Sequence, residues 1–157
     1  MTNPSKELYW DDYVFGRSWE FGTYEMRQDE IVAFARQFDP HPFHLDPEQG
    51  KASPIGVFCA SGAHTICASH RLLCDGLLLR SHVYAGRGLD DVVLCSPVVP
   101  GDVLSIAVKV LSATAHPHRP HLGWIRLAVT TYRQDRSVVL RQKTDILMLR
   151  APDPAAT

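Results

Sequence analysis

Residues 61–76 read Ser-Gly-Ala-His-Thr-Ile-Cys-Ala-Ser-His-Arg-Leu-Leu-Cys-Asp-Gly, and this stretch is the centre around which the rest of the chain is organised. It predicts a helix from about Ser61 to Asp75 that ends at Gly76, because glycine commonly follows a helix C-terminus. Apolar and small side chains occupy nearly every face, which is typical of a buried helix. One broad face is formed by Ala63, Ile66, Cys67, His70, Cys74 and Leu77, and the opposite face is hardly more polar, so the whole helix is expected to be buried.

The chain after this helix has the period-two pattern of β-strands with one buried side. Apolar and polar residues alternate in three segments, 104–110, 125–131 and 138–149. Turns are expected at Pro100-Gly101-Asp102 and at Gln134-Asp135-Arg136. A helix-rich first half followed by a run of antiparallel strands predicts an α+β fold.

Before the central helix, the sequence predicts an opening strand, or two short extended pieces, over residues 9–26. A helix is expected to start near Gln28, with acidic residues in its first turn. Its apolar stripe, expected to pack in the core, comprises Ile31, Phe34, Ala35 and Phe38. A short helix is expected over Pro47–Lys51, and Asp46 is better explained as its N-cap than as a catalytic acid.

Between these two helices, residues 38–44 read Phe-Asp-Pro-His-Pro-Phe-His. Pro40 and Pro42 fix their own φ angles and push the residue before each of them out of the helical region. Asp39 is therefore expected to end the helix, and His44 to project from an extended segment. A carboxylate and a neutral imidazole on one stiff turn can share a water and transfer protons to and from a substrate. An Asp-Pro pair at a helix end is also, and more often, a plain helix stop.

Together with the residues that follow, this turn resembles the MaoC-like dehydratases, a family that includes the (R)-specific enoyl-CoA hydratases. The family pattern has Asp, a proline-containing turn, His, Asp-Pro and a later Gly that opens the central helix. Its positions here are Asp39, Pro42, His44, Asp46-Pro47 and Gly62, and Gly62 comes 18 positions after His44. The resemblance continues in residues 88–92 and 96–102 and extends from about Tyr9 to Leu149. His41 stands where many hydratases of the family have Asn.

The resemblance implies the hotdog fold, in which an antiparallel sheet wraps around one long helix. It also implies reversible addition of water across the α,β-double bond of an acyl-CoA thioester. Asp39 and His44 are the expected catalytic pair, and the backbone N–H of Gly62 is expected to stabilise charge on the thioester oxygen. Further residues expected to bind substrate are Pro42, Phe43 and Ser61. For Ser61, capping of the central helix is the stronger expectation.

Two other functions fit the same residues. A thioesterase of the hotdog fold would direct water at the carbonyl carbon instead of Cβ. A non-catalytic acyl-CoA-binding or structural hotdog subunit would need neither an acid nor a base, and His41 gives that interpretation some support. The acid and the imidazole on one turn favour the hydratase. Because the sites of this family form between subunits, the resemblance also implies a homodimer or a higher homo-oligomer.

Composition narrows the class of protein. The 157 residues fit one domain, expected to span 1–157, and contents of 45% hydrophobic and 21% charged residues are those of a soluble globular protein. A net charge of −1 gives no field that would attract nucleic acid or an anionic membrane. Neither a signal peptide nor an apolar run of about 20 residues is seen, so a cytoplasmic location without a membrane partner is expected.

The remaining metal-ligating and nucleophilic residues favour neither a metal nor a cofactor. Cys59, Cys67, Cys74 and Cys95 form no Cys-x-x-Cys pair and fit reduced, buried thiols better than disulfides, ligands or a nucleophile. His64 and His70 are six apart and fit a core or an interface. The segment His116-Pro117-His118-Arg119-Pro120-His121 fits a solvated hairpin loop better than a metal cage. Neither a phosphate-binding loop nor a nucleophile elbow is present, so redox cofactors and serine catalysis are disfavoured.

Overall fold

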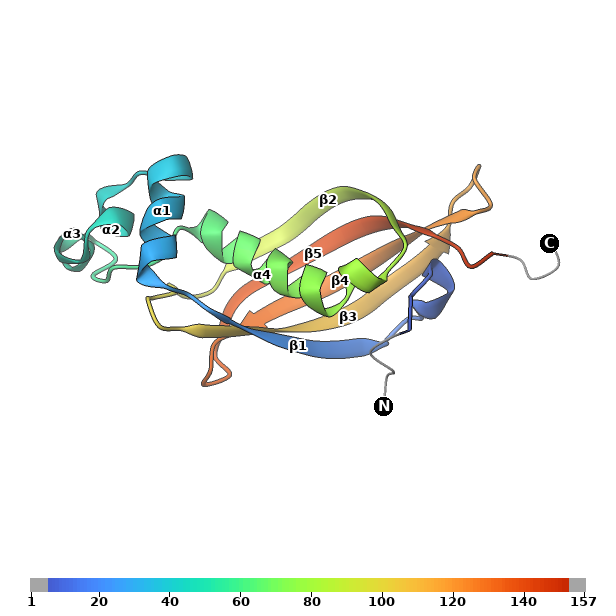
Figure 1. Ribbon diagram of the computed structural model, residues 1–157, viewed down its shortest axis with the longest axis horizontal. Coiled ribbons are helices and arrows are strands. Elements are labelled where there is room, and N and C mark those ends of the chain that lie inside the picture. The colour runs from blue at the N-terminus through green and yellow to red at the C-terminus, as the bar shows by residue number, and fades with distance from the viewer. Residues whose placement is uncertain (1–5, 153–157) are drawn as a thin grey trace.

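The computed structural model describes residues 6–152, so the first and last five residues of the predicted domain lie outside the described part. One antiparallel sheet has the strand order β1-β3-β4-β5-β2. Its strands are β1 (Ser18–Glu25), β2 (Val83–Leu94), β3 (Val103–Ala115), β4 (Leu122–Tyr132) and β5 (Val138–Leu149). The helices are α1 (Gln28–Phe38), α2 (Pro42–Leu45), α3 (Pro47–Ala52) and α4 (Gly62–Gly76), with 3-10 turns η1 (Trp10–Asp12) and η2 (Leu78–Arg80). Figure 1 shows α4 lying along one face of the sheet, which confirms the α+β prediction.

The core lies between α4 and the inner face of the sheet. The predicted alternation on β3 and β4 is confirmed, because every second side chain is buried there: Leu104, Ile106, Val108, Val110, Ile125, Leu127 and Val129. The predicted turn before β3 is also present, and Gly101 occupies it with φ of 88°, a conformation that favours glycine. Burial on this one face fixes the register of the strands relative to α4.

The prediction that α4 is buried nearly all round was wrong, because one of its faces is exposed. The buried side chains on the helix are His64, Thr65, Ala68, Ser69, Leu72 and Leu73, and Leu77, just after the helix, is buried as well. Of the other residues named from the sequence, Ala63, Cys67 and His70 are exposed, and Ile66 and Cys74 are partly buried. Hydrophobicity alone did not locate the buried face, because a polar side chain on it, Ser69, finds hydrogen-bond partners on the sheet. Thr131 of β4, for example, donates a hydrogen bond to Ser69 over 2.8 Å.

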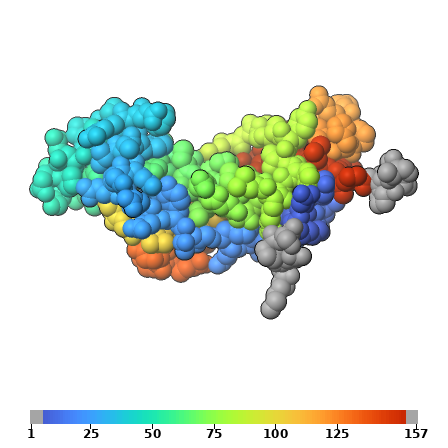
Figure 2. Space-filling view, in the orientation of Figure 1, coloured from blue at the N-terminus to red at the C-terminus, as the bar shows by residue number. Residues whose placement is uncertain are grey.

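The helices α1, α2 and α3 gather at the end of the molecule where α4 begins (Figure 1), and the space-filling view shows them as a lobe at that end (Figure 2). Asp39 is the C-cap of α1, as predicted. Ile31 and Ala35 are buried, but Phe38 is 63% exposed, so the apolar stripe of α1 is shorter than expected. Asp46 caps α3 by accepting hydrogen bonds from the backbone N–H groups of Glu48 and Gln49, which confirms that prediction.

The prediction that His44 projects from an extended segment was wrong. His44 lies on α2, a single helical turn that begins at Pro42. Proline is tolerated at the first helical position, because the N–H that it lacks would have no intrahelical acceptor there. The turn buries the imidazole, which is 6% exposed, and directs it toward the start of α4.

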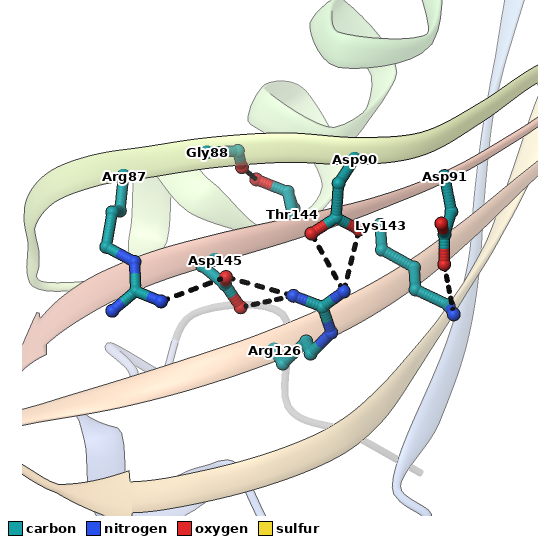
Figure 3. Close-up of polar contacts among 8 residues, drawn as sticks. All are labelled: Arg87, Gly88, Asp90, Asp91, Arg126, Lys143, Thr144 and Asp145. Carbon is teal, nitrogen blue, oxygen red and sulfur yellow. Dashed lines mark hydrogen bonds and ion pairs between the residues drawn. The ribbon is translucent and has the colours of Figure 1, made fainter.

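Strand β2 forms an edge of the sheet, and all twelve of its residues are exposed in the single chain. Large apolar side chains on it include Tyr84, Leu89, Val92, Val93 and Leu94. On the face away from α4, Arg126 of β4 binds Asp90 of β2 and Asp145 of β5, and Lys143 binds Asp91 (Figure 3). These ion pairs hold the bulged edge strand against its neighbours.

Other predictions concerned loops and thiols. Residues 116–121 form the loop between β3 and β4, as predicted. All four cysteines are free; Cys59 is buried and Cys74 partly buried, but Cys67 and Cys95 are exposed, so burial was wrongly predicted for these two. Within residues 6–152, no three His, Cys, Asp or Glu side chains gather as a metal site. No helix of the same part of the chain has the length and hydropathy needed to cross a membrane.

Candidate active site

The predicted acid and imidazole lie together where α1, α2 and the start of α4 meet. Asp39 ends α1, and its Oδ2 lies 3.6 Å from Nε2 of His44 on α2. The side chain of His44 is 8% exposed and that of Asp39 28%, so the pair faces both the protein interior and an opening. The two groups that the sequence placed five positions apart are thus neighbours in space.

The backbone fixes the tautomer of His44. Its Nδ1 lies 2.6 Å from the carbonyl oxygen of Cys59. A carbonyl oxygen can only accept, so Nδ1 carries the proton and donates it. The neutral ring therefore presents an unprotonated Nε2 to Asp39.

In this form of the ring, Nε2 of His44 and the carboxylate of Asp39 face each other as two acceptors. Their separation of 3.6 Å is longer than a hydrogen bond. A water about 2.8 Å from both atoms could donate one hydrogen to each, which is the arrangement that orients and activates water.

Ser61 connects this pair to α4. Its hydroxyl donates a hydrogen bond of 2.6 Å to Asp39 Oδ2 and accepts one of 3.2 Å from the N–H of Ala63. Ser61 is therefore the N-cap of α4, as the sequence predicted, and it also holds the carboxylate of Asp39. Contact between Ser61 and a substrate stays a prediction.

Gly62 is the first residue of α4, so its N–H has no acceptor within the helix and lies at the positive end of the helix dipole. Gly62 and His44 both line a cavity of about 360 Å³. A Cβ added at Gly62 would overlap the side chain of Leu94, at the end of β2. Glycine therefore lets the edge strand and a ligand approach the helix start closely.

The rest of the cavity wall is mainly apolar. Its other lining residues are Phe43, Ile55, Cys59, Ala60, Thr65, Leu94, Cys95, Ser96, Pro97 and Val98. Phe43, a predicted substrate-binding residue, is among them, whereas Pro42 lines a neighbouring groove with Glu48 and Gln49. An apolar cavity with a few convergent polar groups suits a largely hydrocarbon ligand.

His41 stands on the other side of the carboxylate from His44. Its Nε2 is 3.7 Å from Asp39 Oδ1, its side chain is 65% exposed, and its ring stacks on Phe43 with centroids 5.2 Å apart. Asp39 is thus flanked by two imidazoles and one hydroxyl. His41 therefore places a second imidazole next to the carboxylate of Asp39.

Cys59 lies beside His44, with Sγ 3.9 Å from Nδ1. Burial raises the pKa of the Cys59 thiol, which disfavours the thiolate needed for nucleophilic attack. Nδ1 is moreover already engaged by the backbone carbonyl of the same residue. The geometry therefore gives Cys59 a role in holding His44, and it supplies no activated thiol.

Three parts of the site could not be identified from the sequence. The Cys59 carbonyl, the bond from Ser61 to Asp39 and the position of Leu94 over Gly62 all join segments distant in the chain. The N-cap pattern at the start of the central helix was the single usable signal, and it located Ser61 without revealing its second partner. Main-chain acceptors such as the Cys59 carbonyl have no signature in the residue types.

A larger depression of about 750 Å³ lies at the start of α1. Its wall carries four charged side chains, Glu25, Arg27, Asp29 and Arg36. Arg27 and Asp29 already pair with each other there. The smaller cavity is the stronger candidate, because it brings His44 and the free N–H at the start of α4 to one apolar space.

Comparison with known proteins finds similar sequences and structures over most of the chain. Residues 13–131 match the family described as the MaoC like domain. The MaoC-like dehydratase from Rhodospirillum rubrum is 31% identical, with a TM-score of 0.84 over 93% of this chain and 99% of that chain. An uncharacterized protein, YdeM of Bacillus subtilis (strain 168), is 27% identical over 89% of this chain and 98% of its own length.

A more distant structure shares the fold. The (R)-hydratase PhaJ1 from Pseudomonas aeruginosa, solved in the unliganded form, is 19% identical, with a TM-score of 0.71 over 92% of this chain and 88% of that chain. Structural similarity of this kind confirms the hotdog fold predicted from the sequence.

Proposed function

The chain belongs to the MaoC-like dehydratase family, and from this premise we propose that it hydrates the α,β-double bond of an acyl-CoA thioester, or removes water in the reverse direction. The observation that carries the proposal is the pair of acceptors, Asp39 Oδ2 and His44 Nε2, 3.6 Å apart beside an apolar cavity. Two (R)-hydratases among its structural neighbours share the fold.

In the proposed reaction, one water donates hydrogen bonds to both members of the pair. Its oxygen forms a bond to Cβ while one of its protons passes to Asp39 or His44. A proton from the pair then forms the new bond to Cα. One water is consumed, and the pair returns to its starting protonation state.

The proposed binding mode places the thioester oxygen at the N–H of Gly62. As water adds at Cβ, negative charge develops on this oxygen, and a fixed backbone donor at the positive end of α4 stabilises it. The acyl chain then lies in the apolar cavity, against residues such as Phe43 and Val98. The same carbonyl site would also serve a thioesterase, so the reaction must be distinguished by its product.

We also propose that the active form is a homodimer joined through β2. A twelve-residue edge strand with exposed apolar side chains is a template for pairing with another strand. A second copy of this chain is the occupant that fits best, because the same edge can pair with itself about a twofold axis. Leu94 and Cys95, which line the cavity, lie at the end of this edge, so assembly would complete the cavity wall.

Two assays run in parallel test the proposed reaction. A panel of 2-enoyl-CoA thioesters is followed by loss of the conjugated-thioester absorbance, and a free-thiol assay on the same samples detects hydrolysis. Loss of the conjugated absorbance without thiol release supports a hydratase. Stoichiometric thiol release would establish a thioesterase instead, and binding without either signal would indicate a non-catalytic acyl-CoA-binding subunit.

Light scattering tests the assembly. The wild type is expected to have twice the 17.5 kDa chain mass or a multiple of it. Val93→Lys combined with Leu89→Lys should give monomers with little activity, because lysines on an edge strand oppose strand pairing. Phe15→Lys is the control, since Phe15 is 79% exposed but lies outside β2. A fully active wild-type monomer would contradict the proposed dimer.

A further inference from the structure

Three polar side chains are buried together where α4 packs on the sheet. Ser69 and Thr131 have no exposed surface, and Gln142 is 4% exposed. The hydroxyl of Thr131 donates to Ser69 Oγ over 2.8 Å, and Nε2 of Gln142 donates to the same oxygen over 3.2 Å. Residues from α4, β4 and β5 therefore form one polar cluster inside an apolar core.

One atom of this cluster is left without a partner. Oε1 of Gln142 is buried and accepts no hydrogen bond from the described residues. Buried polar atoms are almost always paired in folded proteins, since an unpaired one has lost its hydration without compensation. A methionine would fill similar space without an unpaired atom, so the amide indicates a donor that comes from outside the chain.

Both walls of the candidate cavity lead toward this cluster. On the helix side, Thr65 lines the cavity, and Ser69 is one turn further along the same buried face of α4. On the sheet side, Leu94 of β2 lines the cavity and lies opposite Leu140 of β5 in the strand pairing. Gln142 is two residues after Leu140 on β5, so the two side chains point to the same face of the sheet. The cluster therefore lies beyond the inner end of the cavity, in the direction in which α4 runs away from Gly62.

The length of acyl chain that reaches the cluster follows from the same two walls. Seven helical residues separate Gly62 from Ser69, which is about 10 Å along the axis. Two strand residues separate Leu140 from Gln142, which is about 7 Å. An extended hydrocarbon advances roughly 1.3 Å per carbon, since its bonds of about 1.5 Å zigzag. The hydrogen bond from the chain to the cluster spans about 2.8 Å of the helical distance. The remaining distance of roughly 7.5 Å brings a chain that starts at the Gly62 N–H to the cluster near its sixth carbon.

We infer that the inner end of the cavity selects acyl thioesters that carry a hydroxyl group near carbon six, held by Gln142 Oε1. The inference rests on the proposed function, which places the thioester oxygen at Gly62. A hydroxyl can also accept from an amide N–H, so it suits the cluster whichever end of the Gln142 amide meets the chain. A plain hydrocarbon chain leaves the amide unpaired and binds less tightly.

Equilibrium binding of two unreactive thioesters tests the inference. In 6-hydroxyhexanoyl-CoA and heptanoyl-CoA, a hydroxyl replaces a methyl group at equal chain length, and neither molecule has a double bond to hydrate. Titration calorimetry on the wild-type protein should give a Kd at least about tenfold lower for the hydroxy thioester, because a site built to bind a hydroxyl discriminates against its absence. Gln142→Met should reduce this ratio to near one.

Thr144→Val is the matched control, because it removes a hydroxyl from the same strand that donates to Gly88 and not to the cluster. This variant should keep the wild-type ratio. Equal or reversed affinities in the wild type overturn the inference without any variant, and so does a folded Gln142→Met protein that keeps the preference. If the preference holds but no enoyl-CoA is hydrated, the proposed reaction fails and the selectivity stands. Hydration without the preference supports the proposed reaction and overturns the selectivity.

Discussion

Replacement of Ser61 tests how the site is assembled, because its single hydroxyl makes two contacts. Ser61→Ala removes the N-cap of α4 and the hydrogen bond to Asp39 Oδ2. Loss of a serine N-cap costs about 1 kcal/mol of stability. A hydrogen bond to a charged group contributes about 1.5–3 kcal/mol, but Asp39 is 28% exposed and water can replace much of this bond. The free energy of unfolding should therefore fall by about 1–2 kcal/mol.

Catalysis should fall more than stability. Without Ser61 the carboxylate of Asp39 can turn away from the water that it shares with His44, and loss of correct positioning costs about 10–100-fold in kcat/KM. Ser61→Gly separates the two contacts, because glycine as an N-cap costs only a few tenths of a kcal/mol. It should lose less stability than Ser61→Ala and be as inactive as that variant. Ser61→Thr keeps the hydroxyl and should retain most of both properties.

Denaturant unfolding followed by circular dichroism measures the stability of the three variants, and enoyl-CoA hydration measures their activity. Wild-type turnover by both Ser61→Ala and Ser61→Gly would refute the positioning role of the hydroxyl. Activities that fall in proportion to stability would refute it as well, because the hydroxyl would then act through the helix alone.

Three further predictions concern neighbouring groups. Gly62→Val should lower kcat/KM by about 100-fold or more, which is the scale of one lost oxyanion donor, and Gly62→Ala should lower it by less. A Cβ at position 62 would overlap the side chain of Leu94. If adding Leu94→Ala restores activity, the loss is due to packing and not to the lost donor. Cys59→Ala should cost about 1 kcal/mol of stability. Its activity should stay within about threefold of the wild type, because the group of Cys59 that binds His44 is the backbone carbonyl. A folded but inactive variant would implicate the thiol. Burial lowers the pKa of His64 below its usual 6.5, so the unfolded chain binds more protons there and the folded state loses stability as the pH falls through that value. Urea unfolding from about pH 7 to pH 5 should therefore show a steeper loss of unfolding free energy in the wild type than in His64→Phe. Phenylalanine at position 64 keeps the stacking on Phe34. Parallel pH dependence of the two proteins would contradict this assignment.

Local chemistry made several elements predictable from the sequence. The limits of α1 and β5, the caps at Asp46 and Ser61 and the alternation on β3 and β4 each follow from interactions within a few residues or from one repeating pattern. The approach of Asp39 to His44 was also expected, because one short turn carries both.

The features that were missed depend on contacts between distant segments. The buried face of α4 carries Ser69, and only the positions of Thr131 and Gln142 on the sheet explain why its hydroxyl is acceptable there. The helical turn at His44 depends on Cys59, fifteen residues away, whose carbonyl holds the imidazole. The exposure of β2 follows from its place at the sheet edge, which no pattern within the strand reveals.

In the proposed mechanism Asp39 and His44 act on one water, and a double-mutant cycle on hydration is the sharpest test of this pairing. Asp39→Asn keeps the size of the side chain, and His44→Asn keeps a donor for the Cys59 carbonyl while removing Nε2. Each variant should fold and lose about 10²–10⁴-fold in kcat. The double variant should be little worse than the poorer single variant, because the groups act as a unit. Near-normal kcat in either single variant, or losses that multiply in the double variant, would contradict the shared-water mechanism.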